Sequence, residues 1–326
     1  MPRFLHISDI HLGFDRYDNA VRSRDFFYAF YDVLEKYAVG EQVDFVLIAG
    51  DLFEHRSIQP ATLNQAQIGL RLLQDQGIPA IAIEGNHDNR PYGTKTSWLR
   101  YLADWGLVIL LEPGEIANGE VFYSPWDNKR KQGGYLDLDG GVRIFGSTWY
   151  GATAPTAIQQ IADAIDVLPD RATHQILLFH HGLEGQVSRY AGALRYGDLL
   201  PLKAAGIDYL ALGHIHKNYT VEDWIYNPGS LEANSLEEAR YERGAYLVEL
   251  TDNGIDATLK QDYQQRPIVR LLLTTRGHER QEELVEAAIA TVQQAIQNRH
   301  IQPDQQPLVE LRITGEVGFD RLDLDT

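Results

Sequence analysis

The sequence predicts an α/β fold whose core is a parallel β-sheet. Short apolar segments of the kind that form buried strands occur at residues 4–7, 45–49 and 79–83. Between them, over residues 26–37 and 63–73, apolar side chains recur every three or four positions, as on one face of a helix. This strand–helix–strand–helix–strand order predicts parallel strands joined by right-handed crossovers.

The middle of the chain, from about residue 98 to 167, has a different pattern of apolar residues and turns. Trp98, Tyr101 and Trp105 lie at helical spacing, so we expect all three in the core. From about residue 121 to 150, short apolar stretches alternate with Gly-rich turns, as in antiparallel hairpins. A helix near residues 156–167 follows.

Further strands are expected beyond that helix. Their apolar segments lie at residues 175–179, 209–212, 245–250 and 255–260. A second pattern begins after these strands, with an apolar strand, an amphipathic helix and a half-exposed strand. We therefore predict a first domain over residues 1–262 and a small α/β domain over residues 263–326. The acidic end FDRLDLDT is compatible with a longer native chain that was cut there.

Composition limits the classes of protein to consider. The chain of 326 residues has no cysteine, which excludes disulfides and thiolate metal sites. The N-terminus does not read as a signal peptide, and no apolar run reaches the roughly 18 residues of a membrane span. We therefore expect a cytoplasmic protein without a membrane partner. The net charge of −17 counts against simple electrostatic binding of a DNA duplex, although bound metals and local basic clusters would offset it.

Side chains that bind metals follow five of the apolar segments. They are Asp9 and His11, then Asp51, then Asn86 and His87, then His180, and finally His214 and His216. Because strands of one sheet present their carboxyl ends at one edge, we expect these side chains to converge. Five of the 11 histidines lie in these segments, which chance placement would rarely produce.

Each residue taken alone has a simpler interpretation. Asp51 after a strand is commonly a helix cap, and a buried histidine is commonly a satisfied core residue. We interpret His6, inside the first apolar segment, in that way. For the whole set, recurrence of the same pattern favours a metal site.

The ligand types indicate which ions and which chemistry to expect. Imidazole, carboxylate and amide groups without thiolate suit manganese best, with iron, zinc and magnesium as alternatives. The ligands are too many for one ion, so we predict two divalent ions bridged by Asp51. Such a pair serves phosphoester hydrolysis: the ions lower the pKa of a shared water, the hydroxide attacks the phosphorus in line, and a nearby histidine protonates the leaving oxygen.

These residues also stand in motifs that resemble a known family. Asp9-x-His11, Gly50-Asp51, GNHD at 85–88, His180 and Gly213-His214-x-His216 are similar to the motifs of the calcineurin-like metallophosphoesterase superfamily. SDIHLG, GDLF, ALGHIH and NPGSLE bring the chain nearest to the SbcD-type DNA repair nucleases. The resemblance implies a metallophosphoesterase-type two-sheet β-sandwich flanked by helices, followed by a small α/β capping domain.

The resemblance also implies a role for each matching residue. One metal ion would be held by Asp9, His11, Asp51 and His216. The other would be held by Asp51, Asn86, His180 and His214. His87 falls at the catalytic histidine that acts on the leaving group.

Other site residues follow less directly from the motifs. After GDLF, many of these nucleases have a second catalytic histidine, but Glu54 takes that place here and His55 follows. We take His55 as a candidate phosphate-orienting catalytic residue, with a surface residue at a helix start as the alternative. Arg16, Arg90 and Tyr92 are candidate substrate-binding residues, since basic and aromatic side chains hold nucleic acid strands.

Two activities fit this site. The first is a manganese-dependent DNA nuclease of DNA repair, exonucleolytic with some endonuclease activity. The alternative is a phosphodiesterase or phosphatase for small molecules such as nucleotides. The resemblance implies a homodimer that works with an SbcC-type ATPase, although we expect the helical region that would bind such a partner to be either absent or cut off here. A non-catalytic scaffold is disfavoured because no ligand is missing.

Overall fold

The computed structural model describes residues 1–16, 20–115, 120–187, 192–251 and 254–320. The chain divides into two compact units. The first unit consists of Met1–Asn234 and Arg240–Gln264, and the second of Ser235–Ala239 and Gln265–Thr326. In the described part of the chain, no helix has the length and apolarity that a bilayer crossing requires.

The first unit contains a six-stranded mixed sheet. In sheet order its strands are β14 (Gly254–Lys260), β13 (Ala245–Thr251), β1 (Arg3–Ile7), β2 (Phe45–Ile48), β3 (Ala80–Ala82) and β4 (Ile109–Leu110). Strands β1 to β4 are parallel, whereas β13 and β14 add to the β1 edge in antiparallel pairs. The parallel core that the first 85 residues predict is therefore present.

A second six-stranded sheet packs against the first. In sheet order its strands are β11 (Tyr219–Val221), β12 (Ile225–Asn227), β10 (Tyr209–Gly213), β9 (His174–His180), β8 (Val142–Phe145) and β7 (Tyr135–Leu138). Strands β8, β9, β10 and β12 are parallel, and β7–β8 is an antiparallel hairpin. A short pair, β5 (Gly114–Glu115) and β6 (Val121–Phe122), lies outside both sheets.

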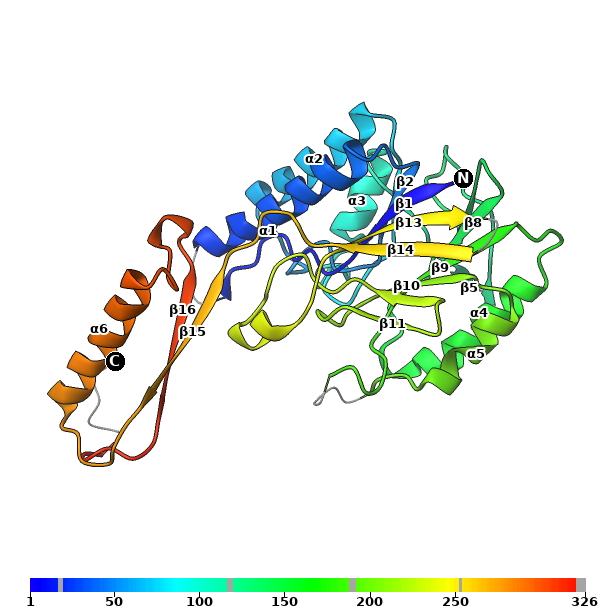
Figure 1. Cartoon of the computed structure of the whole chain (residues 1–326). Helices are drawn as coiled ribbons and strands as arrows, with labels where there is room; N and C mark the ends of the chain where they lie inside the picture. The colour runs from blue at the N-terminus through cyan, green and yellow to red at the C-terminus, as the bar shows by residue number, and fades with distance from the viewer. Residues whose placement is uncertain (17–19, 116–119, 188–191, 252–253, 321–326) are drawn as a thin grey trace. The chain divides into compact units, whose positions relative to one another are not determined.

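Helices cover the outer faces of the two sheets (Figure 1). On the first sheet lie α1 (Ala20–Val33), its π-helical continuation η2 (Leu34–Val39), α2 (Pro60–Asp75) and α3 (Trp98–Asp104). On the second lie α4 (Ala154–Asp166), which follows the 3-10 turn η3 (Gly151–Thr153), and α5 (Tyr196–Ala204). The predicted α/β fold, with two sheets flanked by helices, is confirmed.

Alternation along the central strands explains this layered structure. Phe4 and Leu47 point between the two sheets, where they pack with strands β9 and β10. Their neighbours Leu5 and Ile48 point the other way, toward the helices. All four side chains are fully buried. Strands β1 and β2 therefore read as continuous apolar segments because each is covered on both faces.

The second unit is a small βαβ element. Strands β15 (Ile268–Thr274) and β16 (Leu308–Thr314) are parallel neighbours, and α6 (Gln281–Gln297) connects them. The 3-10 turn η5 (Pro303–Gln305) also belongs to it, as does the 3-10 turn η4 (Leu236–Arg240) except for its last residue. Its core is small and centres on Leu271, Ala295 and Ile301. The division of the chain at residue 262, and a capping role for this unit, remain our proposal.

Two expectations from the sequence were wrong. Trp105 is 68% exposed instead of buried, because α3 ends at Asp104 and the tryptophan leaves the apolar face of the helix. The predicted ligands also do not lie at the edge of one sheet. They follow β1, β2 and β3 of the first sheet and β9 and β10 of the second, so their convergence depends on how the two sheets pack.

The interpretation of His6 as a core residue agrees with its environment. Its side chain is fully buried, with Nδ1 2.9 Å from the Tyr209 hydroxyl and Nε2 3.0 Å from the carbonyl oxygen of Leu212. Burial lowers the pKa of His6 to about 3, against a smaller raising effect of the Leu212 carbonyl. The folded protein therefore keeps this imidazole neutral under mildly acidic conditions.

His6 should make folding sensitive to acid. Below pH 6.5, His6 binds a proton in the unfolded chain but stays neutral in the folded chain. The free energy of unfolding therefore falls as the pH drops from 6.5 toward 3. The slope from this residue is about 1.4 kcal/mol per pH unit. Urea unfolding at pH 7 and pH 5 measures this effect. Between these two pH values, we expect the free energy of unfolding to fall by about 2 kcal/mol more in the wild type than in His6→Gln. Equal losses in the two proteins would contradict a neutral buried His6.

Candidate metal centre

The loops that follow β1 and β2 are bound to each other along their backbones. The amide of Asp9 donates to the carbonyl oxygen of Gly50 at 3.1 Å. The amides of Ile10 and His11 both donate to the carbonyl oxygen of Asp51, at 2.8 and 3.1 Å. These bonds hold three of the predicted ligands side by side at the carboxyl ends of two parallel strands.

Four predicted ligands have an uncommon backbone conformation. The φ angles are 52° for Asp9, 51° for His11, 54° for Asp51 and 87° for His214. Non-glycine residues rarely adopt positive φ, and such strain persists only where the surrounding structure imposes it. The concentration of these residues at the ends of β1, β2 and β10 marks this region as a functional site.

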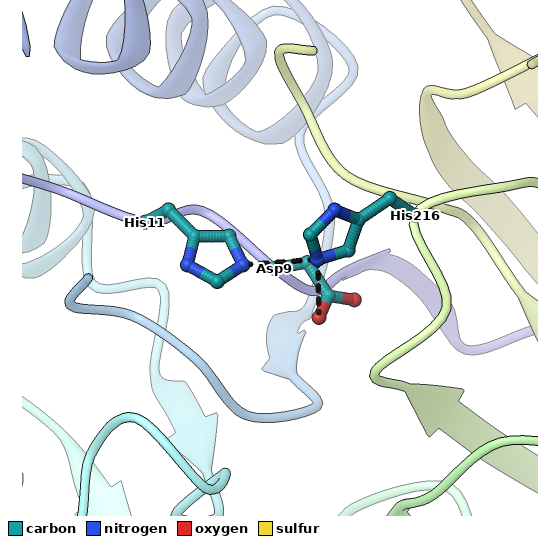
Figure 2. A group of neighbouring side chains, drawn as sticks. All are labelled: Asp9, His11 and His216. Atoms are coloured by element: carbon teal, nitrogen blue, oxygen red, sulfur yellow. Dashed lines mark hydrogen bonds and ion pairs between the residues drawn. The ribbon is translucent and has the colours of Figure 1, made fainter. Parts of the chain in front are cut away.

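The first group of ligands contains Asp9, His11 and His216 (Figure 2). The Nε2 atoms of His11 and His216 are 3.1 Å apart, and Nε2 of His216 lies 3.8 Å from Oδ1 of Asp9. The Asp9 carboxylate is fully buried and accepts hydrogen bonds from the His214 amide and the Ser8 hydroxyl. Ligand atoms from both sheets thus converge on one point.

The second group contains Asp51, His180 and His214, with Asn86 beside it. Nε2 of His180 is 3.2 Å from Oδ2 of Asp51 and 3.2 Å from Oδ1 of Asn86. Nδ1 of His180 lies 2.7 Å from the carbonyl oxygen of Ala49, to which it donates. Nε2 of the neutral ring is then an acceptor that faces two other acceptors, an arrangement that suits a cation.

The charges at this second group support the same conclusion. Burial would raise the pKa of Asp51, but the neighbouring His180, His11 and His87 hold it below its usual range. Burial would lower the pKa of His180, but the Asp51 carboxylate raises it overall. For His214, burial and then the charge of His180 lower the pKa to about 2. The buried carboxylate therefore requires positive charge beside it, from a proton or from a metal ion.

Two glycines allow the loops to approach this closely. A Cβ atom on Gly85 would lie 2.1 Å from Oδ1 of Asp51 and 2.6 Å from its amide nitrogen. A Cβ atom on Gly50, whose φ is +91°, would lie 2.4 Å from Nδ1 of His180. A larger residue at either position would push a predicted ligand out of the group, which accounts for the glycines in both motifs.

His87 lies at the edge of the two groups, beside a carboxylate that sequence reasoning did not include. The His87 amide donates to Oδ1 of Asp51 at 2.9 Å, and its Nδ1 lies 2.6 Å from the carbonyl oxygen of Glu54. Side-chain atoms of His11, Glu54 and His87 form a third group of potential ligands. Glu54, the carboxylate that sequence reasoning missed, is buried, and its Oε2 lies 2.8 Å from Nδ1 of His11.

Asp88 and Trp149 contact the loops and rings of the ligand groups without being potential ligands themselves. The Asp88 carboxylate is buried and accepts hydrogen bonds from the amides of Leu52, Phe53 and Gly85, so it shapes the loops instead of facing the ligands. Burial, followed by the charge of Asp51, raises the pKa of Asp88 to about 6. The Trp149 ring packs on His214, with ring centres 5.0 Å apart. Neither role has a local sequence signal beyond the GNHD motif.

The other predicted site residues lie at the surface around these groups. The Arg16 side chain is 53% exposed, and its Nε is 3.3 Å from Oε1 of Glu54. His55 is exposed and lies 2.9 Å from the Asp15 carboxylate, which leaves it outside the three ligand groups. Arg90 and Tyr92 are both exposed. Their predicted roles stay predictions.

Comparison with known proteins decides the family. Residues 2–218 match the family described as calcineurin-like phosphoesterase, and this range contains every residue of the two ligand groups. The chain belongs to this family. The family resemblance of the strand-end motifs is therefore confirmed, and the matched range contains groups of histidine and aspartate that could bind metal.

Several similar proteins are named DNA double-strand break repair protein Mre11. The one from Archaeoglobus fulgidus is 32% identical over 73% of this chain and 52% of its own length. The one from Aeropyrum pernix is 42% identical over 77% of this chain and 58% of its length. The one from Saccharolobus solfataricus is 26% identical over 97% of this chain and 76% of its own length. The chain thus spans little more than half the length of the first two relatives.

Proposed function

We propose that this protein is a two-metal-dependent phosphodiesterase that acts as a DNA nuclease in DNA repair, with exonuclease and some endonuclease activity. The observation that carries the proposal is the meeting of two ligand groups, Asp9–His11–His216 and Asp51–His180–His214, at the ends of both sheets. The similar proteins named for DNA double-strand break repair favour DNA as the substrate. Manganese is the preferred ion because the ligands mix imidazole with carboxylate and amide oxygens.

The residues divide between two ions. The first would be held by Asp9, His11, Asp51 and His216, and the second by Asp51, Asn86, His180 and His214. Asp51 is assigned to both because the family resemblance implies a bridging aspartate there; its Oδ2 faces His180, and its backbone carbonyl accepts the amides of Ile10 and His11. When bound, two such ions activate a water at neutral pH and offset the charge of the phosphoryl oxygens.

The side chains around the ligands have their own tasks. Nδ1 of His87 donates to the carbonyl oxygen of Glu54, so a second proton on this ring sits on Nε2. From there it can be given to the oxygen that leaves the phosphorus. Arg16 is exposed beside the first group and presents a guanidinium, the side chain that best matches a phosphate. Further candidate contacts to a bound DNA strand are Arg90, Tyr92 and His55.

A small-molecule or nucleotide phosphodiesterase is the alternative on the same site. The named relatives favour the nuclease, and so does the second unit, which a strand-binding enzyme can use to position DNA. A homodimer and an SbcC-type ATPase partner belong to the proposal through the family resemblance.

Manganese-dependent digestion of linear duplex DNA tests the proposal. The same preparation is assayed on mononucleotides and on bis(p-nitrophenyl) phosphate. We expect DNA cleavage that requires manganese and stops when a chelator is added. Cleavage of the small substrates alone would favour the alternative, and no cleavage of any phosphoester would end the proposal.

A further inference from the structure

Glu54 is a buried carboxylate between the ligands and the surface. Only 2% of its side chain is exposed, and its amide donates to the carbonyl oxygen of Leu12 at 3.0 Å. Burying a carboxylate costs several kcal/mol unless its charge is paired. Its two oxygens face two different partners, Nδ1 of His11 and Nε of Arg16.

The contact with His11 fixes which ring nitrogen carries the proton. Oε2 of Glu54 is 2.8 Å from Nδ1 of His11, and both groups are almost fully buried. At this distance a carboxylate oxygen would repel a lone pair on Nδ1, so the proton of the neutral ring sits on Nδ1. Nε2 then keeps its lone pair and faces His216, 3.1 Å away. Carboxylates in this place orient metal-binding histidines and make them stronger ligands.

The contact with Arg16 orients a group that can bind phosphate. Oε1 of Glu54 lies 3.3 Å from Nε of Arg16, whose side chain is 53% exposed. Since Nε faces the carboxylate, the two terminal amino groups of the guanidinium are left for the paired oxygens of a phosphate. A second contact, between Nε2 of His55 and Oδ1 of Asp15 at 2.9 Å, joins the same two chain segments at the surface.

We propose that Glu54 is a positioning residue that couples metal binding to phosphate binding in this site. Through Oε2 it presents Nε2 of His11 to the first ion, and through Oε1 it holds the exposed Arg16 beside the first ligand group. The proposal deepens the proposed function and rests on it. It also gives the glutamate, in the place of the histidine of many related nucleases, a task that needs two acceptor oxygens, one for Nδ1 of His11 and one for Nε of Arg16.

Metal binding and ring chemistry provide the first test. The variants are Glu54→Ala and the near-isosteric Glu54→Gln, and the control is Glu84→Gln, a largely buried carboxyl whose partner is Ser97. Manganese titration by calorimetry should show that Glu54→Ala weakens one of two sites by about 10- to 100-fold, with Glu54→Gln in between and the control unchanged. Nitrogen-15 NMR of the metal-free protein should show His11 protonated at Nδ1 in the wild type and as a mixture of tautomers in Glu54→Ala.

Kinetics provide the second test, at saturating manganese. Arg16→Gln should raise KM for a phosphodiester by about tenfold with little change in kcat, as expected for a lost charged hydrogen bond. Adding Arg16→Gln to Glu54→Ala should raise KM no further. Thermal unfolding confirms that each variant is folded, and Glu54→Gln serves if Glu54→Ala is not.

The outcomes separate this proposal from the proposed function. Unchanged manganese affinity and unchanged His11 tautomer in a folded Glu54 variant would overturn the role of Glu54. Independent effects of the Glu54 and Arg16 substitutions on KM would overturn the coupling. A wild type that cleaves no phosphoester would end the proposed function, while the NMR measurement on the metal-free protein would still decide whether Glu54 orients His11.

Discussion

Replacing Asp51 with asparagine is expected to lower phosphodiester turnover by about 10²- to 10³-fold. Its carboxylate lies 3.2 Å from His180 and accepts a hydrogen bond from the His87 amide, so it joins the second ligand group to the loop of His87. Losing one preorganised charge at a reaction centre costs about 3–4 kcal/mol in the transition state. Steady-state cleavage of bis(p-nitrophenyl) phosphate with excess manganese measures the effect.

The Asp51→Asn variant needs a matched control and a second readout. Asp163→Asn is suitable because Asp163 pairs with Gln159 on the exposed surface of α4 and should leave turnover unchanged. Manganese titration of Asp51→Asn should show that tight binding of two ions is lost. Turnover within tenfold of the wild type would show that Asp51 does not bridge two ions.

The second large effect is expected for His87→Gln. This substitution removes the proton donor for the leaving oxygen but none of the proposed ligands, so both manganese ions should still bind. Because the leaving group of DNA is an alkoxide that needs a proton, kcat on DNA should fall by about 10²- to 10⁴-fold. The p-nitrophenolate group leaves without a proton, so cleavage of bis(p-nitrophenyl) phosphate should fall by much less.

The comparison of two substrates makes the His87 prediction specific. An equal loss on DNA and on the activated ester would mean that His87 does not act as the acid. Loss of one manganese ion in the titration would mean that it is a ligand. Nδ1 of His87 is engaged by the carbonyl oxygen of Glu54, which leaves Nε2 as the nitrogen whose role the two measurements decide.

Much of the fold is predictable because burial on both faces leaves a clear pattern. The run at residues 45–49 is apolar without interruption because β2 packs on the second sheet through Leu47 and on the helices through Ile48. The ligand types are predictable for a related reason. Asp51 and His180 each stand at the end of such a run, where a polar side chain needs a partner.

The parts that sequence reasoning missed depend on contacts between distant segments. The meeting of Asp9 with His216 requires two separate sheets to end at the same place, and no local pattern records that. Glu54 is visible in the sequence only as a departure from the family. Its role depends on His11 and Arg16, which come from a different loop. Trp105 follows the helical spacing but lies beyond the end of its helix.

The central claim is that scattered side chains from two sheets surround a pair of metal ions. Anomalous diffraction at the manganese absorption edge, from crystals of the wild type soaked in manganese chloride, tests it most directly. We expect two peaks about 3.5–4 Å apart with a carboxylate oxygen of Asp51 between them. A single peak, or peaks away from Asp51, would contradict it.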